Sequence, residues 1–259
     1  MKRRKAVIWG IAVVIVITFI IAVLIDNSRK VDFEDETMAE MIAKTVGVES
    51  ADKLRVNDLE KIEILNIGYT GYYDTLVDIE KCPNLKRLFI GCPEYAQIYY
   101  PFIGRKIPEP ESRERVEQIE KELGDILGKC SKLEDIYISN ERGNCELDNI
   151  EFLKKGRKHL VAIGLFYQAD IDYSPISECR KLSYLSLRYS DISDLGMISE
   201  LENLDNLVLT GTEISEATDI LKLKELNFFR IADTPLAENN EQLELIQQQF
   251  PELKIQTDY

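Results

Sequence analysis

Apolar residues recur along the second half of the chain in a nine-residue phrase with constant spacing. The phrase LENLDNLVL at 201–209 is followed 22 residues later by LKELNFFRI at 223–231, and CRKLSYLSL at 179–187 precedes it at the same spacing. Each phrase places apolar residues at its first, fourth, seventh and ninth positions. A fixed period in the twenties with this pattern is typical of a leucine-rich repeat solenoid.

Four earlier segments fit the same pattern, with Arg157 as the one departure: 59–67, 82–90, 130–138 and 157–165. The seventh and ninth positions lie two residues apart, which is the period of a strand with one buried face. The pattern therefore predicts an α/β solenoid, a leucine-rich repeat of about seven units. Its parallel strands should stack about 4.8 Å apart in one sheet.

The two ends of the repeat series carry different sequences. Residues 31–58 predict a helical N-terminal cap, with an amphipathic helix in 31–48 and Asn57 as the N-cap of a second, short helix. Residues 237–259 predict a C-terminal cap whose helix ends before Pro251. A solenoid needs such atypical ends because an uncapped terminal unit would expose its apolar flank to water.

One interval within the repeats, which span 59–236, is about twice the normal length. The excess is an irregular insertion at 93–129, whose second half predicts a charged helix. Its first half is an aromatic loop that contains Tyr95, Tyr99 and Tyr100. Long loops in compact repeat proteins are usually functional or disordered, and dense aromatic residues argue against disorder. The rings either contact a partner or pack onto the solenoid in place of a missing repeat.

The first thirty residues predict a membrane anchor. Residues 6–25 form an apolar run without charge, which at about 1.5 Å per residue reaches the roughly 30 Å of a bilayer core. The basic tail 1–5 precedes the run, and the short spacer 26–30 follows it. This excess of positive charge predicts a single-pass protein of the cytoplasmic membrane, with its N-terminus inside and its repeats outside. The alternative is a cleaved signal peptide, whose apolar stretch would normally be shorter and end in small residues.

The charge of the remaining chain limits its partners. Beyond the predicted span stand 28 basic and 46 acidic residues, a formal charge of −18. Such a field disfavours nucleic acid or an anionic lipid surface as the main partner. A large solvated surface is an equally good explanation for the charge.

The cysteines and the single histidine give little support for chemistry. Cys82, Cys130 and Cys179 occupy the first position of their phrases and are expected to be buried as small apolar residues. Cys92 and Cys145 follow neighbouring strands, so a disulfide between them is possible. His159 is expected to be exposed. No zinc-ligand spacing, phosphate-binding loop or nucleophile elbow occurs, so we expect no metal, no cofactor and no enzyme.

Strand periodicity identifies the side chains on the face of the sheet that need not be apolar. It carries aromatic rings and arginines: Phe89, Tyr137, Phe166, Tyr184, Arg188, Phe228 and Arg230. Such residues favour a protein or peptide contact, although they can also form a self-contained ladder of cross-strand stacks. The aromatic loop leaves the stack between the strands that bear Phe89 and Tyr137. We therefore expect the loop tyrosines and this part of the face to enclose a common volume.

The repeats, the T-x-I-S corner at 212–215 and the helical entry resemble bacterial internalin-type leucine-rich repeat domains over nearly all of 31–259. The resemblance implies the fold and a binding role, since such domains serve as adhesins, receptors and scaffolds. The chain departs from the family pattern in its insertion and lacks the corner asparagine of many repeats. Two hypotheses follow: a membrane-anchored extracytoplasmic module that binds a protein or peptide, or a structural or regulatory subunit that docks on another membrane protein.

The register predicts how single substitutions affect stability. Leu207 occupies a seventh position, so Leu207→Asp would bury a carboxylate without a partner and lower the free energy of unfolding by about 4 kcal/mol or more. Asp205→Ala, on the adjoining turn, should change it by about 0.5 kcal/mol or less. Urea unfolding followed by circular dichroism measures both values. Equal tolerance at the two positions would remove the basis for the register.

Overall fold

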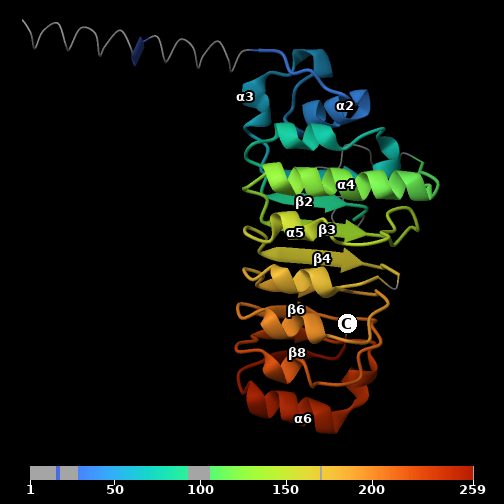
Figure 1. Ribbon diagram of the computed structural model, residues 1–259, viewed down its shortest axis with the longest axis vertical. Helices are drawn as coiled ribbons and strands as arrows, with labels where there is room; N and C mark the ends of the chain where they lie inside the picture. The colour runs from blue at the N-terminus through green and yellow to red at the C-terminus, as the bar shows by residue number, and fades with distance from the viewer. Residues whose placement is uncertain (1–15, 18–28, 93–105, 170, 259) are drawn as a thin grey trace, which may run out of the picture.

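The computed structural model describes residues 16–17, 29–92, 106–169 and 171–258. They form an α/β solenoid with one parallel sheet, in which each strand pairs with the next along the chain (Figure 1). The strands are β1 (Ile64–Gly68), β2 (Arg87–Ile90), β3 (Asp135–Ser139), β4 (Ala162–Phe166), β5 (Tyr184–Ser186), β6 (Asn206–Val208), β7 (Phe228–Arg230) and β8 (Lys254–Gln256). The predicted leucine-rich repeat architecture is therefore confirmed.

The register of the sheet follows the nine-residue phrase. Each of the first seven strands begins at the sixth position of its phrase. The seventh positions then pair across the sheet as a ladder: Leu65, Leu88, Ile136, Ile163, Leu185, Leu207, Phe229 and Ile255. All but Ile255 are fully buried in the main core. Burial of each such side chain stabilises the fold by roughly 1.5–3 kcal/mol relative to exposure.

Short helical segments return the chain along the other side of the core (Figure 1). They are η3 (Val77–Lys81), α4 (Arg113–Lys129), α5 (Leu153–Gly156), η5 (Ser174–Glu178), η6 (Gly196–Glu200) and η7 (Ile220–Lys222). Each ends at the residue directly before a phrase. The first position of the phrase then turns the chain into the core, and Cys82, Cys130 and Cys179 are buried there as predicted.

The N-terminal cap contains α2 (Glu36–Thr45), η1 (Ala51–Lys53) and α3 (Val56–Leu59), and η2 (Thr70–Tyr72) lies in the first corner. The carboxylate of Asp35 caps α2 by accepting a hydrogen bond from the Met38 N–H at 2.7 Å. The prediction for α3 is wrong in detail. Asn57 lies inside the helix, Arg55 occupies the N-cap position, and Asp58 accepts a hydrogen bond from the Arg55 N–H at 3.0 Å.

At the other end, η8 (Pro235–Glu238) and α6 (Asn240–Gln249) are followed by β8. This eighth strand lies within the predicted C-terminal cap and exceeds the seven units that the phrases indicate. Its phrase is hard to recognise because the first and fourth positions are the polar Gln249 and Glu252. Leu253 and Ile255 supply the apolar contacts in their place.

Buried carboxylates connect the irregular parts to the repeats. Asp78 is fully buried and accepts hydrogen bonds from the backbone N–H groups of Glu34 at 2.9 Å and Asp35 at 2.8 Å, and it forms an ion pair with Lys81. Asp35 in turn accepts a hydrogen bond from the Asp74 N–H at 2.6 Å. These contacts fasten the N-terminal cap to the first repeat.

The insertion is held in the same way. Glu122 of α4 accepts hydrogen bonds from the Leu76 N–H at 2.8 Å, in the preceding unit. Glu120 of the same helix accepts hydrogen bonds from the N–H groups of Asp148 at 2.7 Å and Asn149 at 2.8 Å, in the following unit. The long helix thus satisfies exposed backbone donors on both sides and fills the place of a repeat.

The five cysteines are all buried, and none of them forms a disulfide. The possible disulfide is absent: the Cys92 thiol contacts the Ile90 carbonyl at 3.2 Å, whereas the Cys145 sulfur lies 3.9 Å from the Thr70 hydroxyl. Burial raises the pKa of the Cys145 thiol to about 11 and that of Cys82 to about 12.

Within the ranges given above, no helix is both long and apolar enough to cross a bilayer. The expected span at 6–25 lies outside those ranges, except for Val16 and Ile17.

The buried Asp78 predicts a large loss of stability on substitution. Asp78→Ala leaves the N–H groups of Glu34 and Asp35 and the Lys81 ammonium without their acceptor, so the free energy of unfolding should fall by about 3 kcal/mol. Urea unfolding measures the loss. Asp74→Ala, an exposed carboxylate four residues earlier, is the control and should change it by less than about 0.5 kcal/mol. Equally small losses of stability in the two variants would contradict a role for Asp78 in fastening the N-terminal cap.

The buried thiols predict low reactivity. Only thiolates react with maleimide or iodoacetamide, and thiols with a raised pKa inside the core are neither ionised nor accessible at pH 7.5. Native protein should therefore label at none of Cys82, Cys130, Cys145 and Cys179, and all four should label in urea. Mass spectrometry after timed labelling provides the measurement. Fast native labelling of any of them would show that its repeat opens.

Candidate binding surface

The face of the sheet opposite to the helical segments presents the sixth and eighth positions of the phrases; we call it the open face. Its first row is Ile64, Arg87, Asp135, Ala162, Tyr184, Asn206, Phe228 and Lys254, and its second row is Asn66, Phe89, Tyr137, Gly164, Ser186, Val208, Arg230 and Gln256. Phe166 and Arg188 follow two positions later in their units. The six strand residues that the sequence predicts for a binding face thus share one face, and Arg188, two residues beyond β5, contacts Phe166. Tyr95, Tyr99 and Tyr100 lie outside the described residues.

An aromatic ladder occupies the N-terminal half of the open face. The rings of Phe89 and Tyr137 stack with their centroids 4.9 Å apart and an angle of 8° between their planes. The Tyr137 centroid lies 6.3 Å from both Phe166 and Tyr184. Such pairs contribute about 0.5–1.5 kcal/mol each beyond the area that they bury.

The exposure of two predicted site residues differs from expectation. Phe89 is only 4% exposed and Phe166 is fully buried, and with Cys92 they form a second apolar cluster. Gly164 is the physical reason: a Cβ atom there would lie 2.4 Å from the Tyr137 ring and 2.7 Å from the Phe166 ring. Because the glycine has no side chain, the neighbouring rings close over it. These two residues therefore support the surface from beneath.

Cations complete the open face. The Arg188 guanidinium carbon lies 4.6 Å from the centroid of Phe166, in a cation–π contact. Arg87 forms an ion pair with Asp135 at 2.8 Å. Arg230 is half-buried and Lys254 is exposed at the C-terminal end of the sheet. Lys254 is not among the predicted site residues, because the sequence does not predict the strand β8 that bears it.

A tyrosine pair at the neighbouring corner was also missed. Tyr167 and Tyr189 stack with their centroids 4.7 Å apart, and the Tyr189 ring lies against Gly211, where a Cβ atom would approach it to 2.2 Å. Both tyrosines have φ of 57°, a left-handed conformation that costs a bulky residue roughly 1–3 kcal/mol. Gly211 and Asp233 share this conformation at the same 22-residue spacing. The spacing could have revealed this corner position.

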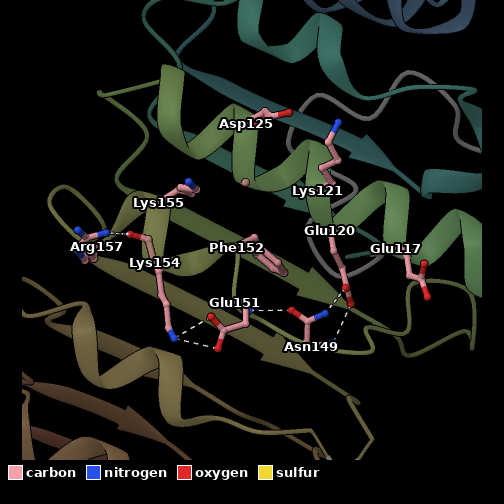
Figure 2. Close-up of a pocket in the computed structure, with 11 residues that line it drawn as sticks. Glu117, Glu120, Lys121, Asp125, Asn149, Glu151, Phe152, Lys154, Lys155 and Arg157 are labelled. Carbon is pink, nitrogen blue, oxygen red and sulfur yellow. Dashed lines mark hydrogen bonds and ion pairs between the residues drawn. The ribbon is translucent and has the colours of Figure 1, made fainter.

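A hollow of about 640 Å³ lies between α4 and α5 (Figure 2). Two of its carboxylates have partners: Glu120 accepts hydrogen bonds from the turn at Asn149, and Glu151 pairs with Lys154 at 2.8 Å. Burial raises the pKa of Glu120 although these N–H donors oppose the shift. Lys121 and Asp125 point away from the two paired groups (Figure 2). The labelled side chains do not converge on a common point (Figure 2).

His159 is half-buried, in contrast to the exposed position that the sequence predicts. Its Nδ1 lies 2.6 Å from the Leu133 carbonyl oxygen, and its Nε2 lies 3.0 Å from that of Leu127. The ring therefore bridges the last turn of α4 and the turn before β3. No three His, Cys, Asp or Glu residues of the described ranges are placed to hold a metal ion.

Comparisons with known proteins identify the fold. No protein-family model matches the chain, and no curated protein matches it. Among solved structures, internalin C2 of Listeria monocytogenes is similar with a TM-score of 0.53 and 17% identity, covering 86% of this chain and 94% of that one. An internalin of the same species covers 87% of this chain and 76% of its own length, with a TM-score of 0.38 and 15% identity. The match to a leucine-rich repeat protein of Leptospira interrogans covers 78% of this chain and 56% of that one, with a TM-score of 0.43 and 16% identity. The first likeness supports an internalin-like leucine-rich repeat fold.

The close packing of aromatic rings over Gly164 predicts that a side chain at this position would disturb the packing locally. Gly164→Ala should displace the Tyr137 and Phe166 rings and lower the free energy of unfolding by about 1–3 kcal/mol. Urea unfolding and the near-ultraviolet circular dichroism of the rings should report the change. Gly128→Ala in the last turn of α4, where a Cβ atom would meet nothing within 4 Å, is the control and should stabilise by up to about 1 kcal/mol. An unaltered ring signal in Gly164→Ala would contradict the packing described.

Proposed function

We propose that the chain is a membrane-anchored extracytoplasmic leucine-rich repeat protein that binds a protein or peptide on its open face. The observation that carries the proposal is the concentration of aromatic and cationic side chains on the one sheet face that none of the described helices covers. Aromatic residues and arginine are the types most enriched among residues that dominate binding energy. The internalin-like fold supports a binding role at the level of the fold class.

The side chains of the open face have two different roles, namely support of the ladder and contact with the partner. Phe89 and Phe166 are buried and hold the ladder in place, so their substitution would affect stability first. The partner contacts are proposed for the half-exposed Tyr137, Tyr184, Arg188, Phe228 and Arg230, together with the loop tyrosines Tyr95, Tyr99 and Tyr100. Tyrosine suits this role because it offers a large area and a hydroxyl group at low rotamer entropy.

Site-specific photo-cross-linking in cells tests the binding face. A benzophenone amino acid at Phe228 should yield a discrete adduct with the partner. The same amino acid at Leu245, an exposed residue of α6, should not. Tyr184→Ala should weaken that adduct and leave the unfolding midpoint within a few degrees, because Tyr184 is half-exposed. Adducts from Leu245 alone would place the contact elsewhere.

The anchor and the orientation are part of the proposal, and they rest on the apolar run at 6–25 and the basic tail 1–5. Protease added to intact spheroplasts should degrade residues 31–259, whereas a tag at the N-terminus should survive. Protection of the repeats in sealed cells would overturn the exported topology.

The alternative role is that of a structural or regulatory subunit that docks on another membrane protein. Exchanging residues 6–25 for an unrelated apolar helix distinguishes this role from the proposed one. The adduct from Phe228 should persist after the exchange. Its loss would favour docking through the helix.

A further inference from the structure

The open face has a different charge from the rest of the domain. The chain beyond the predicted span carries a formal charge of −18. Asp135 is nevertheless the only carboxylate in the two rows defined above, and Arg87 pairs with it. Arg230 and Lys254 are the other charged members, and both are cations. Within these rows the β5–β8 end therefore carries two cations and no carboxylate.

The same end contains polar groups whose hydrogen-bonding capacity is unused. Four buried atoms there have no hydrogen-bond partner among the described residues: Ser186 Oγ, Thr210 Oγ1, Arg230 Nε and Gln256 Oε1. Arg230 and Gln256 are register partners on β7 and β8, and no described residue accepts a hydrogen bond from the guanidinium. A buried unpaired polar group costs about 1–3 kcal/mol, and a charged one costs more. A ligand that supplies an anionic acceptor would remove this cost for Arg230.

We infer that the β5–β8 end of the open face binds an extended acidic segment of the protein partner, with carboxylates on Arg230 and Lys254. This inference rests on the proposed function. Arg230 and Lys254 lie on adjacent strands about 4.8 Å apart and differ by two register positions, so their Cα atoms are about 8 Å apart. An extended peptide places alternate side chains about 7 Å apart on one side. Two glutamates or aspartates that are separated by one residue in a bound segment can therefore reach both cations.

The ligand is a peptide segment rather than a long polyanion for two reasons. The Debye length is about 8 Å at physiological ionic strength, so the two cations attract locally while the surrounding acidic surface repels a chain that continues beyond them. Tyr184 and Phe228 stand half-exposed in the same rows and offer apolar contact to the side chains between the carboxylates.

Fluorescence anisotropy with the full chain in neutral detergent tests the inference. The probe is a labelled decapeptide that alternates glutamate with serine after one tyrosine, and its counterpart has glutamine in place of glutamate. The glutamate peptide should bind at least tenfold more tightly. The double variant Arg230→Gln/Lys254→Gln should bind it about tenfold more weakly, and raising sodium chloride from 50 to 500 mM should weaken it similarly.

The matched control is Lys158→Gln/Lys181→Gln, which removes the same charge from exposed positions off the open face and should change the affinity less than twofold. Unfolding midpoints verify that both double variants are folded. Equal losses in the two double variants would show that net charge alone acts and would overturn the inference. An oligonucleotide of equal charge that binds as tightly as the glutamate peptide would overturn the assignment to a peptide.

The photo-cross-link from Phe228 tests the proposed function independently of the peptide-binding measurement. An adduct in cells without any preference for the glutamate peptide would leave the binding role intact and overturn the acidic ligand. A glutamate preference that depends on Arg230 and Lys254, without any adduct, would support the acidic site and overturn the proposed function.

Discussion

The lateral pairing of one buried side chain per unit is the constraint on which the rest of the structure depends. Leu185 and Leu207 illustrate it: each lies in a three-residue strand that is too short to be stable alone. Each side chain is fully buried only because the units before and after it supply the two walls of its site. Stability in such a fold is the sum of contacts between neighbours, so every unit requires both of its flanks to be present.

The interruption of the period shows what replaces a repeat when its phrase is missing. Apolar residues of α4 such as Leu123 and Ile126 rejoin the main core, but a long helix leaves the backbone donors of the adjacent turns uncovered. Glu120 and Glu122 accept hydrogen bonds from those donors on opposite sides of the helix. Asp78 does the same at the N-terminal cap. Buried carboxylates thus occur where the solenoid changes its regular geometry, which explains charges inside a largely apolar core.

The repeat pattern leaves the side chains of the open face free to vary. Because the seventh and ninth positions supply the core, the sixth and eighth are constrained only by their cross-strand neighbours. At Gly164 the absence of a side chain lets aromatic rings close into a rigid ladder. At β7 and β8 the second row ends in Arg230 Nε and Gln256 Oε1, two buried polar atoms without a hydrogen-bond partner among the described residues. One half of the face is therefore packed by aromatic rings, and the other half is polar.

The sequence alone determined the strands and their faces, since a repeated phrase encodes a local period: seven strand starts and the shared face of Phe89 through Arg230 follow from spacing. Tertiary structure decided what spacing does not encode. The burial of Phe89 and Phe166 depends on a glycine two strands away from the first of them. His159 is withdrawn from solvent by carbonyl groups of segments 26 and 32 residues distant. The strand that bears Lys254 forms because it pairs with the edge of β7, although its own phrase lacks apolar residues at the first and fourth positions. These features arise from contacts between units, and such contacts are set by packing in three dimensions.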